Sequence, residues 1–362
     1  MICLASIIKQ YENDLIGKYH RDLLPGHYKV MDAIKKCRSR HSPKMLMQCE
    51  NDDCSYQEFI PHSCGHRHCP HCQNYETQRW IERQLQKQVP ADYFMLTFTL
   101  PAQFRKLAWL KQCLVYGLMF DCVWAVLKTF CLNDKKLGGI PGAIAVLHTN
   151  SRELNFHPHI HIVMPAATID KSRRLWSKKS GKYLFNHKAL AKVFRAKMLD
   201  ALSGNGLKLP RNYPKNWVVD CKHVGKGDKA LVYLAQYLYR GVIKEKDILC
   251  FENGQVTFRC KNSETKKYQT RTVSAVDFLW LVLQHILPRG FRRARDYGFF
   301  HSNSKKLIKI IQWMFRLNPT SYIPKIKKRK RMICSCCGSF MNIVLVRLPA
   351  AAQLPRRKLI SV

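Results

Sequence analysis

Residues 49–72 contain five cysteines and four histidines, a density that indicates a metal site. Cys49 and Cys54 form one pair in this segment, and Cys69 and Cys72 form another. Two such pairs can place four thiolates tetrahedrally around Zn2+, whose filled d shell accepts that geometry readily. We therefore predict one structural Zn2+ held by these four cysteines. Four nearby side chains could replace one of them: Cys64, His66, His68 and His71.

A second group of metal-binding residues follows in the middle of the chain, where His157, His159 and His161 alternate with other residues. On a strand, alternate side chains share one face of the sheet. Two imidazoles at that spacing can bind one metal ion and leave open positions for a substrate. Imidazole suits Mn2+ or another transition metal better than Mg2+, which prefers oxygen. The alternative is that a histidine-rich strand simply forms a polar sheet face.

Two tyrosines in residues 231–240 could act as nucleophiles. If this segment is a helix, Tyr233 and Tyr237 lie one turn apart on the same face, whereas Tyr239 points elsewhere. Tyrosines at this spacing more often pack in a core. Because the pKa of free tyrosine is about 10, a nucleophilic tyrosine needs a metal or a base nearby. The histidine strand could supply that metal, so the two motifs support each other.

The charge of the chain points to a polyanionic partner. Its 362 residues include 62 Lys and Arg against 24 Asp and Glu, a formal net charge of +38, which favours nucleic acid. The 66 residues after Asp296 hold 14 Lys or Arg and no acidic residue. We expect their densest part to contact DNA phosphates, although it could also be a solvated basic face. These residues are Lys325, Lys327, Lys328, Arg329, Lys330 and Arg331.

Composition also bears on the compartment of the protein. Hydrophobic residues make up 46% of the chain, which excludes global disorder. We expect no membrane span, because the longest apolar stretch, residues 113–127, contains Asp121. No signal peptide is predicted, so we expect a reducing cytosol in which the 16 cysteines do not form disulfides. A late pair, Cys334 and Cys337, offers only half of a metal site.

Hydrophobic periodicity predicts a mixture of helices and strands. Strands are expected at 93–100, 143–149, 154–164 and 217–223, with a hairpin at 256–260 and 268–273. Helices are expected as two short elements within 3–38 and at 75–88, 104–130, 188–202, 229–240 and 275–286. The predicted domains are an N-terminal helical and zinc-binding part, a catalytic part and a basic C-terminal segment, at residues 1–90, 91–300 and 301–362.

In order along the chain, these motifs resemble those of the rolling-circle transposases of bacterial insertion sequences. Within the histidine motif, His159 and His161 occupy the family's His-hydrophobic-His positions. The four residues between Cys49 and Cys54 depart from the family, in which two are commoner. The resemblance covers most of the chain and is carried by residues 63–73, 96–101, 147–161, 233–240 and 285–298.

The resemblance implies an HUH, two-tyrosine DNA strand transferase with an N-terminal zinc-binding domain. Its fold would be α+β, with a small helical and zinc-binding domain followed by a central antiparallel sheet flanked by helices. A catalytic Mg2+ or Mn2+ at His159 and His161 would polarise the scissile phosphate. Tyr233 and Tyr237 would cleave single-stranded DNA at element ends and form a 5′-phosphotyrosine. Such a protein would work in the bacterial cytoplasm, associated with the nucleoid.

Several alternatives stay open on the sequence alone. The third ligand of the catalytic metal could be His148, His157 or Gln236. A replication initiator or conjugative relaxase would use the same chemistry as the transposase. A non-catalytic, zinc-containing DNA-binding protein from a decayed element is the alternative from a different class. The sequence does not indicate the oligomeric state.

Overall fold

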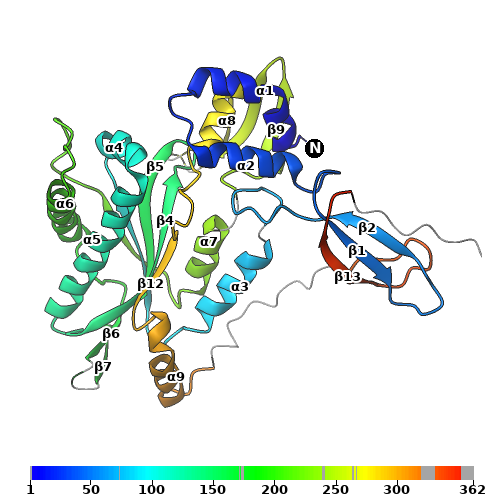
Figure 1. Ribbon diagram of the computed structural model, residues 1–362. Helices are drawn as coiled ribbons and strands as arrows, with labels where there is room; N and C mark the ends of the chain where they lie inside the picture. Colours follow the sequence, from blue (N-terminus) through cyan, green and yellow to red (C-terminus); the bar gives the residue numbers. More distant parts are fainter. Residues whose placement is uncertain are drawn as a thin grey trace, which may run out of the picture.

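A seven-stranded antiparallel sheet forms the centre of the protein (Figure 1). The computed structural model describes residues 2–72, 74–170, 172, 175–238, 241–262, 265, 267–318 and 331–351. In sheet order the strands are β7 (Leu175–Lys178), β6 (Ala167–Asp170), β4 (Ile140–Asn150), β5 (Phe156–Pro165), β3 (Tyr93–Thr99) and β8 (Val219–His223). The seventh strand, β12 (Ala294–Gly298), pairs with β4. The predicted α+β fold with a central antiparallel sheet is confirmed.

One face of this sheet packs against the long helix α5 (Gln112–Asn133) and against α6 (His187–Gly204). Alternate residues of the central strands point into this core, including Phe98 and Ile160. By length and composition alone, α5 is apolar enough to cross a membrane. Asp121, expected to interrupt this stretch, lies on its exposed side, while the opposite side is buried in the core. The structure therefore accounts for the apolar character of α5 as core packing.

The opposite face of the sheet is covered by α7 (Asp228–Leu238) and α3 (Asn74–Leu85). Trp80 of α3 and Leu231 and Leu234 of α7 are buried together with Val163 of β5. Figure 1 shows α3 and α7 on one side of the sheet and α5 on the other. The remaining helices near the sheet are α4 (Arg105–Leu110), α9 (Lys305–Met314), η1 (Ala102–Phe104) and η3 (Ser302–Ser304).

The first two helices pack with a segment that follows the histidine and tyrosine motifs in sequence. Tyr19 of α1 stacks on Trp280 of α8, with 4.6 Å between ring centroids, and its hydroxyl donates to Asp277. The elements of this unit are α1 (Leu4–Tyr19), α2 (Pro25–Lys36), η2 (Glu245–Asp247), β9 (Ile248–Glu252), β10 (Gln255–Lys261), β11 (Tyr268–Ser274) and α8 (Ala275–Leu283). The domain boundaries remain a prediction. The contacts between α1 and α8 join residues on the two sides of the boundary predicted at residue 90.

A second small sheet combines segments from near both ends of the chain. Its order is β13-β1-β2, with β1 (Lys44–Cys49), β2 (Gln57–Pro61) and β13 (Met341–Leu348). Cys49 of β1 lies opposite Met341 of β13 in the antiparallel register. Figure 1 shows this sheet set apart from the central sheet. None of its three strands is predicted from the sequence, because they are short and mostly half-exposed.

The fold generates a test at Gly298, the last residue of β12. Its φ is +59°, and a Cβ there would lie 1.7 Å from the carbonyl oxygen of Pro141. We expect Gly298→Ala to lower the free energy of unfolding by roughly 3 kcal/mol, from left-handed backbone strain and overpacking together. Urea denaturation followed by circular dichroism measures this loss.

Gly290 provides a matched control for this substitution. Its φ is +79°, but a Cβ there would have no atom within 4 Å. Gly290→Ala should therefore cost only the backbone term, about 1 kcal/mol. Equal losses for the two variants would contradict the close packing of β12 against the start of β4.

Candidate functional site

Three histidines meet on the face of the central sheet that α7 covers. His159 and His161 lie on β5, and His148 of β4 is directly opposite His159 in the register. One ring nitrogen of each histidine lies within 4.8 Å of a ring nitrogen of the other two. The ring centroids of His148 and His161 are 4.5 Å apart, and those of His159 and His161 are 4.8 Å apart. Three imidazoles at these separations can hold a single metal ion.

Two of these rings are oriented by hydrogen bonds to their Nδ1 atoms. The Nδ1 atom of His159 donates to the carbonyl oxygen of His157 at 2.6 Å. The Nδ1 atom of His161 lies 2.8 Å from the hydroxyl oxygen of Thr97 on β3. A hydrogen bond at Nδ1 fixes the ring and leaves Nε2 for a metal. Both interactions are therefore of the kind that supports histidine ligands.

Burial keeps these histidines uncharged at neutral pH. Desolvation lowers the pKa of His161 to about 4, and the Asp220 carboxylate offsets part of that effect. Desolvation also lowers the pKa of His148 and of His159 well below the usual value, and the neighbouring Arg293 guanidinium adds to both shifts. A neutral imidazole retains the lone pair that binds a metal. The cluster is thus a set of available nitrogen donors rather than a patch of positive charge.

The structure distinguishes between two of the three candidates for a further metal ligand, His148 and His157. It brings His148 to His159 and His161. His157 shares the strand face but accepts a hydrogen bond at Nδ1 from Arg105 at 2.7 Å, outside this cluster. Gln236 lies within α7, and its side chain is outside the described residues. The geometry therefore favours His148.

The predicted tyrosine helix lies over the histidines. Tyr233 of α7 contacts His161 edge-on, with 6.0 Å between ring centroids and an interplanar angle of 85°. Its side chain is 37% exposed, whereas Leu231 and Leu234 on the same helix are buried. Tyr233 is therefore not a core residue. Tyr237 is also in α7, but its side chain lies outside the described residues, as does all of Tyr239.

Two charged residues beside the histidines were not predicted from the sequence. Asp220 of β8 lies opposite Thr97 of β3, close enough to act on the pKa of His161, and it pairs with Lys222 at 2.6 Å. Arg293 is buried and donates from Nε to the carbonyl oxygen of Leu147 at 3.0 Å. Only strand pairing brings them to the site, so no local motif indicates them.

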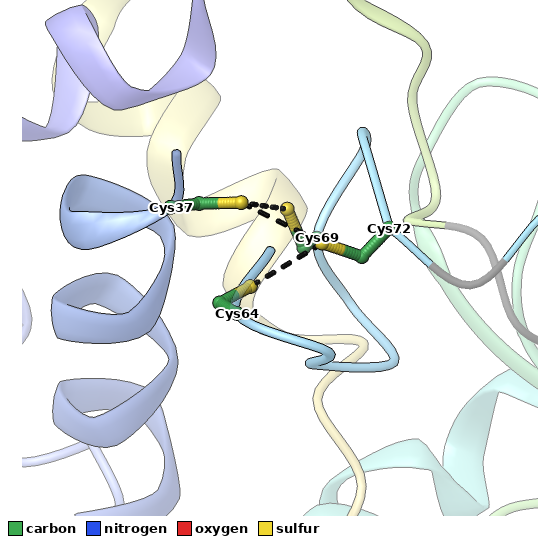
Figure 2. A group of neighbouring side chains, drawn as sticks. All are labelled: Cys37, Cys64, Cys69 and Cys72. Atoms are coloured by element: carbon green, nitrogen blue, oxygen red, sulfur yellow. Dashed lines mark hydrogen bonds between the residues drawn. The ribbon is translucent and has the colours of Figure 1, made fainter. Parts of the chain in front are cut away.

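The first cysteine cluster joins the end of α2 to the loop that follows β2. It consists of Cys37, Cys64, Cys69 and Cys72 (Figure 2). The Sγ–Sγ distances are 3.5 Å for Cys37–Cys72 and 3.6 Å for both Cys37–Cys69 and Cys64–Cys72. Four sulfurs at about 2.3 Å from a tetrahedral Zn2+ are about 3.8 Å apart, so the donor set fits zinc.

The prediction that Cys49, Cys54, Cys69 and Cys72 surround one ion is wrong in its grouping. The structure places Cys69 and Cys72 in the first cluster, and it places the other pair with Cys334 and Cys337. The reason is the course of the chain after residue 49. The β1–β2 hairpin carries its cysteines toward β13, whereas the next loop returns to α2.

The basic segment near the C-terminus is mostly outside the described residues, namely Lys325, Lys327, Lys328, Arg329 and Lys330. Arg331 is described, and it pairs with Glu50 beside β1. Its guanidinium also lies over the ring of Phe340, 4.8 Å from the centroid. In this structure Arg331 therefore makes contacts within the protein, and its predicted role in binding DNA stays a prediction.

Comparisons with known proteins agree with these features. A family model described as "Putative transposase" matches residues 142–307, and one described as "Transposase zinc-binding domain" matches residues 7–100. The chain is 30% identical to "Putative transposase y4qJ" of Sinorhizobium fredii over 82% of this chain and 79% of that protein. It is 27% identical to "Transposase for insertion sequence element IS801" of Pseudomonas savastanoi over 69% of this chain and 64% of that protein.

The hydrogen bond between Thr97 and His161 generates a test of the histidine site. Thr97→Val keeps the shape of the side chain but removes the partner of Nδ1, so His161 loses an orienting contact. We expect the Kd for Mn2+ to rise by roughly tenfold to a hundredfold. The disappearance of the free Mn2+ signal in electron paramagnetic resonance measures binding.

Thr99→Val is the matched control for this test. Thr99 is the next residue on the same face of β3 and lies opposite His159. Its side chain makes no hydrogen bond to any of the three histidines within the described part of the chain. The control should bind Mn2+ with wild-type affinity. Equal Kd values for wild type and Thr97→Val would show that the hydroxyl does not support His161.

Proposed function

Because this chain belongs to the rolling-circle transposases of bacterial insertion sequences that carry an N-terminal zinc-binding domain, we propose that it cleaves and rejoins single-stranded DNA at the ends of its element. The observation that carries the proposal is the contact of Tyr233 with His161, within a cluster of three neutral imidazoles. The contact supports the proposal because it brings a tyrosine next to a set of nitrogen donors that can hold a metal ion.

The histidine cluster would hold the catalytic ion through His148, His159 and His161. The ion would be Mg2+ or Mn2+, and an all-nitrogen set of protein donors favours Mn2+ of the two. Such an ion acts as a Lewis acid that polarises a phosphoryl oxygen. Hydrogen bonds from Nδ1 to Thr97 and to the carbonyl oxygen of His157 already orient two of the rings. Burial keeps the rings neutral. Metal binding therefore requires no proton loss from these rings near pH 7.

Tyr233 would act as a nucleophile toward the scissile phosphate. Its hydroxyl oxygen would form the new bond to phosphorus as the bond to the 3′ oxygen breaks, and the displaced oxygen would leave as a free 3′-OH carrying the proton. The product is a 5′-phosphotyrosine, in which the phosphodiester energy is retained. Attack by another 3′-OH would reverse the step and rejoin the strand without ATP. The partial exposure of Tyr233 leaves room for a DNA strand to approach.

Tyr237 would be the second nucleophile. It lies one turn after Tyr233 on α7, and residues four apart on a helix share a face. Two nucleophiles let the enzyme hold one strand end while it cuts another. Strand exchange between an element end and a target needs both transfers, whereas a single cleavage needs only one.

The partner of this site would be single-stranded and element-end DNA, in the bacterial cytoplasm and associated with the nucleoid. The net charge of +38 provides a strong, sequence-independent attraction for phosphates. Arg105 lies at the edge of the histidine strand, where it donates to His157, and would place a positive charge near a bound strand. We propose no role for a membrane.

Tyrosine substitutions test the nucleophiles. Tyr233→Phe and Tyr237→Phe remove the attacking oxygen but keep the ring, so each variant should fold and each should lose transposition. The double variant should lose all covalent protein–DNA adduct with a single-stranded oligonucleotide from an element end. Adduct formation in the presence of Mn2+, resolved by denaturing gel electrophoresis, measures this loss.

Tyr239→Phe is the control on the same segment, because helical spacing predicts that it points away from the other two tyrosines. It should form adduct at the wild-type rate. An adduct that persists in the double variant would place the nucleophile elsewhere. Failure of the wild-type protein to form any adduct would instead favour a non-catalytic DNA-binding protein.

The basic segment allows a separate test of its binding to DNA. We expect a shallower slope of log affinity against log salt when Gln replaces Lys325, Lys327, Lys328, Arg329 and Lys330. The magnitude of the slope should fall by about 0.7 for each phosphate that the segment neutralises on single-stranded DNA. Fluorescence anisotropy of a labelled oligonucleotide at several salt concentrations gives the slope. Arg331→Gln should change it least, because Arg331 pairs with Glu50. An unchanged slope in the five-residue variant would mean that this segment does not bind phosphate.

A further inference from the structure

The second cysteine cluster brings together two segments that are far apart in the sequence. Cys49 ends β1, and Cys54 lies in the turn between β1 and β2. Cys334 and Cys337 lie in a turn just before β13. The closest pair of sulfurs across the cluster, in Cys49 and Cys337, is separated by 288 positions in the chain. The half-site recognised near the C-terminus is therefore completed by the N-terminal hairpin.

The geometry of this cluster matches a tetrahedral set of thiolate ligands. The Sγ–Sγ distance is 3.4 Å for Cys49–Cys337 and 3.8 Å for Cys54–Cys334, and all four sulfurs lie within 4.8 Å of one another. These distances are close to the edge of about 3.8 Å expected around Zn2+. They are far longer than the S–S bond of about 2.05 Å in a disulfide.

The backbone around the cluster also favours bound thiolates. The amide of Asn51 donates to Cys49 Sγ at 3.4 Å, and this donor follows its cysteine by two residues. The first cluster repeats the pattern, since the amide of His66 donates to Cys64 Sγ at 3.5 Å. Amide donors stabilise negative charge on sulfur, as a metal-bound thiolate requires.

The C-terminal cysteines are held in a tight turn. Gly338 has a φ of +76° and donates from its amide to the carbonyl oxygen of Cys334 at 3.0 Å. The backbone amide of Cys334 in turn donates to the carbonyl oxygen of Ser339 at 2.7 Å. This turn directs the side chains of Cys334 and Cys337 to the same side, whereas Cys336 between them belongs to no cluster within the described residues.

The small sheet has too little apolar core to hold its strands together. Besides the cysteines, its buried side chains are Met47 and Met341, with Tyr56 and Ile60 partly buried. Most of β13 is exposed, including Ile343 at 55%. Units with so small a core usually need a metal or a disulfide for stability. The sulfur distances point to the metal.

We propose that Cys49, Cys54, Cys334 and Cys337 bind a second structural Zn2+, separate from the first cluster. Zinc is the ion that four cysteine thiolates at these distances select in a reducing compartment. The ion fastens residues 331–351 to the β1–β2 hairpin. This site lies outside the catalytic face and does not depend on the DNA chemistry proposed above.

Thiol alkylation of the full-length protein tests the assignment. Cys336 and Cys337 are both exposed, so accessibility alone predicts that both react. If Cys337 is bound to zinc, iodoacetamide should modify it on the order of tenfold more slowly than Cys336. Mass spectrometry of the proteolytic peptide gives both rates. A strong chelator should remove the difference, and equal rates before chelation would overturn the proposal.

Zinc content gives an independent measurement. The double variant Cys334→Ser, Cys337→Ser should contain about one zinc ion fewer per chain than the wild type by elemental analysis. Cys336→Ser is the matched control and should keep the full amount. The double variant Cys37→Ser, Cys64→Ser should instead lose the ion of the first cluster. This loss would show that the two clusters bind zinc separately. Unchanged zinc in the Cys334 and Cys337 variant would refute the second site, and neither measurement involves DNA cleavage.

Discussion

The register between β4 and β5 is the constraint on which the candidate active site depends. It sets His148 opposite His159, and the separate pairing of β5 with β3 sets Thr97 opposite His161. A shift of one residue would turn the histidines into the apolar core and Ile160 toward α7. The register is fixed by the opposite face, where Ile160 and its neighbours pack against α5. The apolar core thus determines where the imidazole nitrogens of the histidine cluster lie.

The two faces of the sheet consequently have different roles. The face toward α5 and α6 is mainly apolar, and its side chains pack into the largest core of the protein. The face toward α7 carries polar side chains that are buried but held by hydrogen bonds, such as His161 with Thr97. Burial makes these histidines neutral, and α7 leaves Tyr233 partly open to solvent. Helices and strands hold the residues of a site more precisely than loops do. Here a strand carries His159 and His161, and a helix carries Tyr233.

The parts of this arrangement that depend on local pattern could be predicted from the sequence. The alternation of His157, His159 and His161 indicates a strand face, and the spacing of Tyr233 and Tyr237 indicates a helix face. The parts that depend on pairing between distant strands could not. His148 remained one of three candidates, and Asp220 gave no signal, because only the order of strands places them at the site. A mostly exposed strand such as β13 also lacks an alternating pattern of buried and exposed residues.

The grouping of the cysteines shows the same limit, since thiols that are close in sequence belong to different clusters. It also has a consequence for synthesis. The first cluster is complete once residue 72 has been made, whereas the second must wait for residue 337. Until then Cys49 and Cys54 are an unfilled pair on a hairpin that lacks its partner strand. A chain that ended before residue 334 would therefore leave Cys49 and Cys54 without the other two sulfurs of their cluster, and the β1–β2 hairpin without a neighbouring strand.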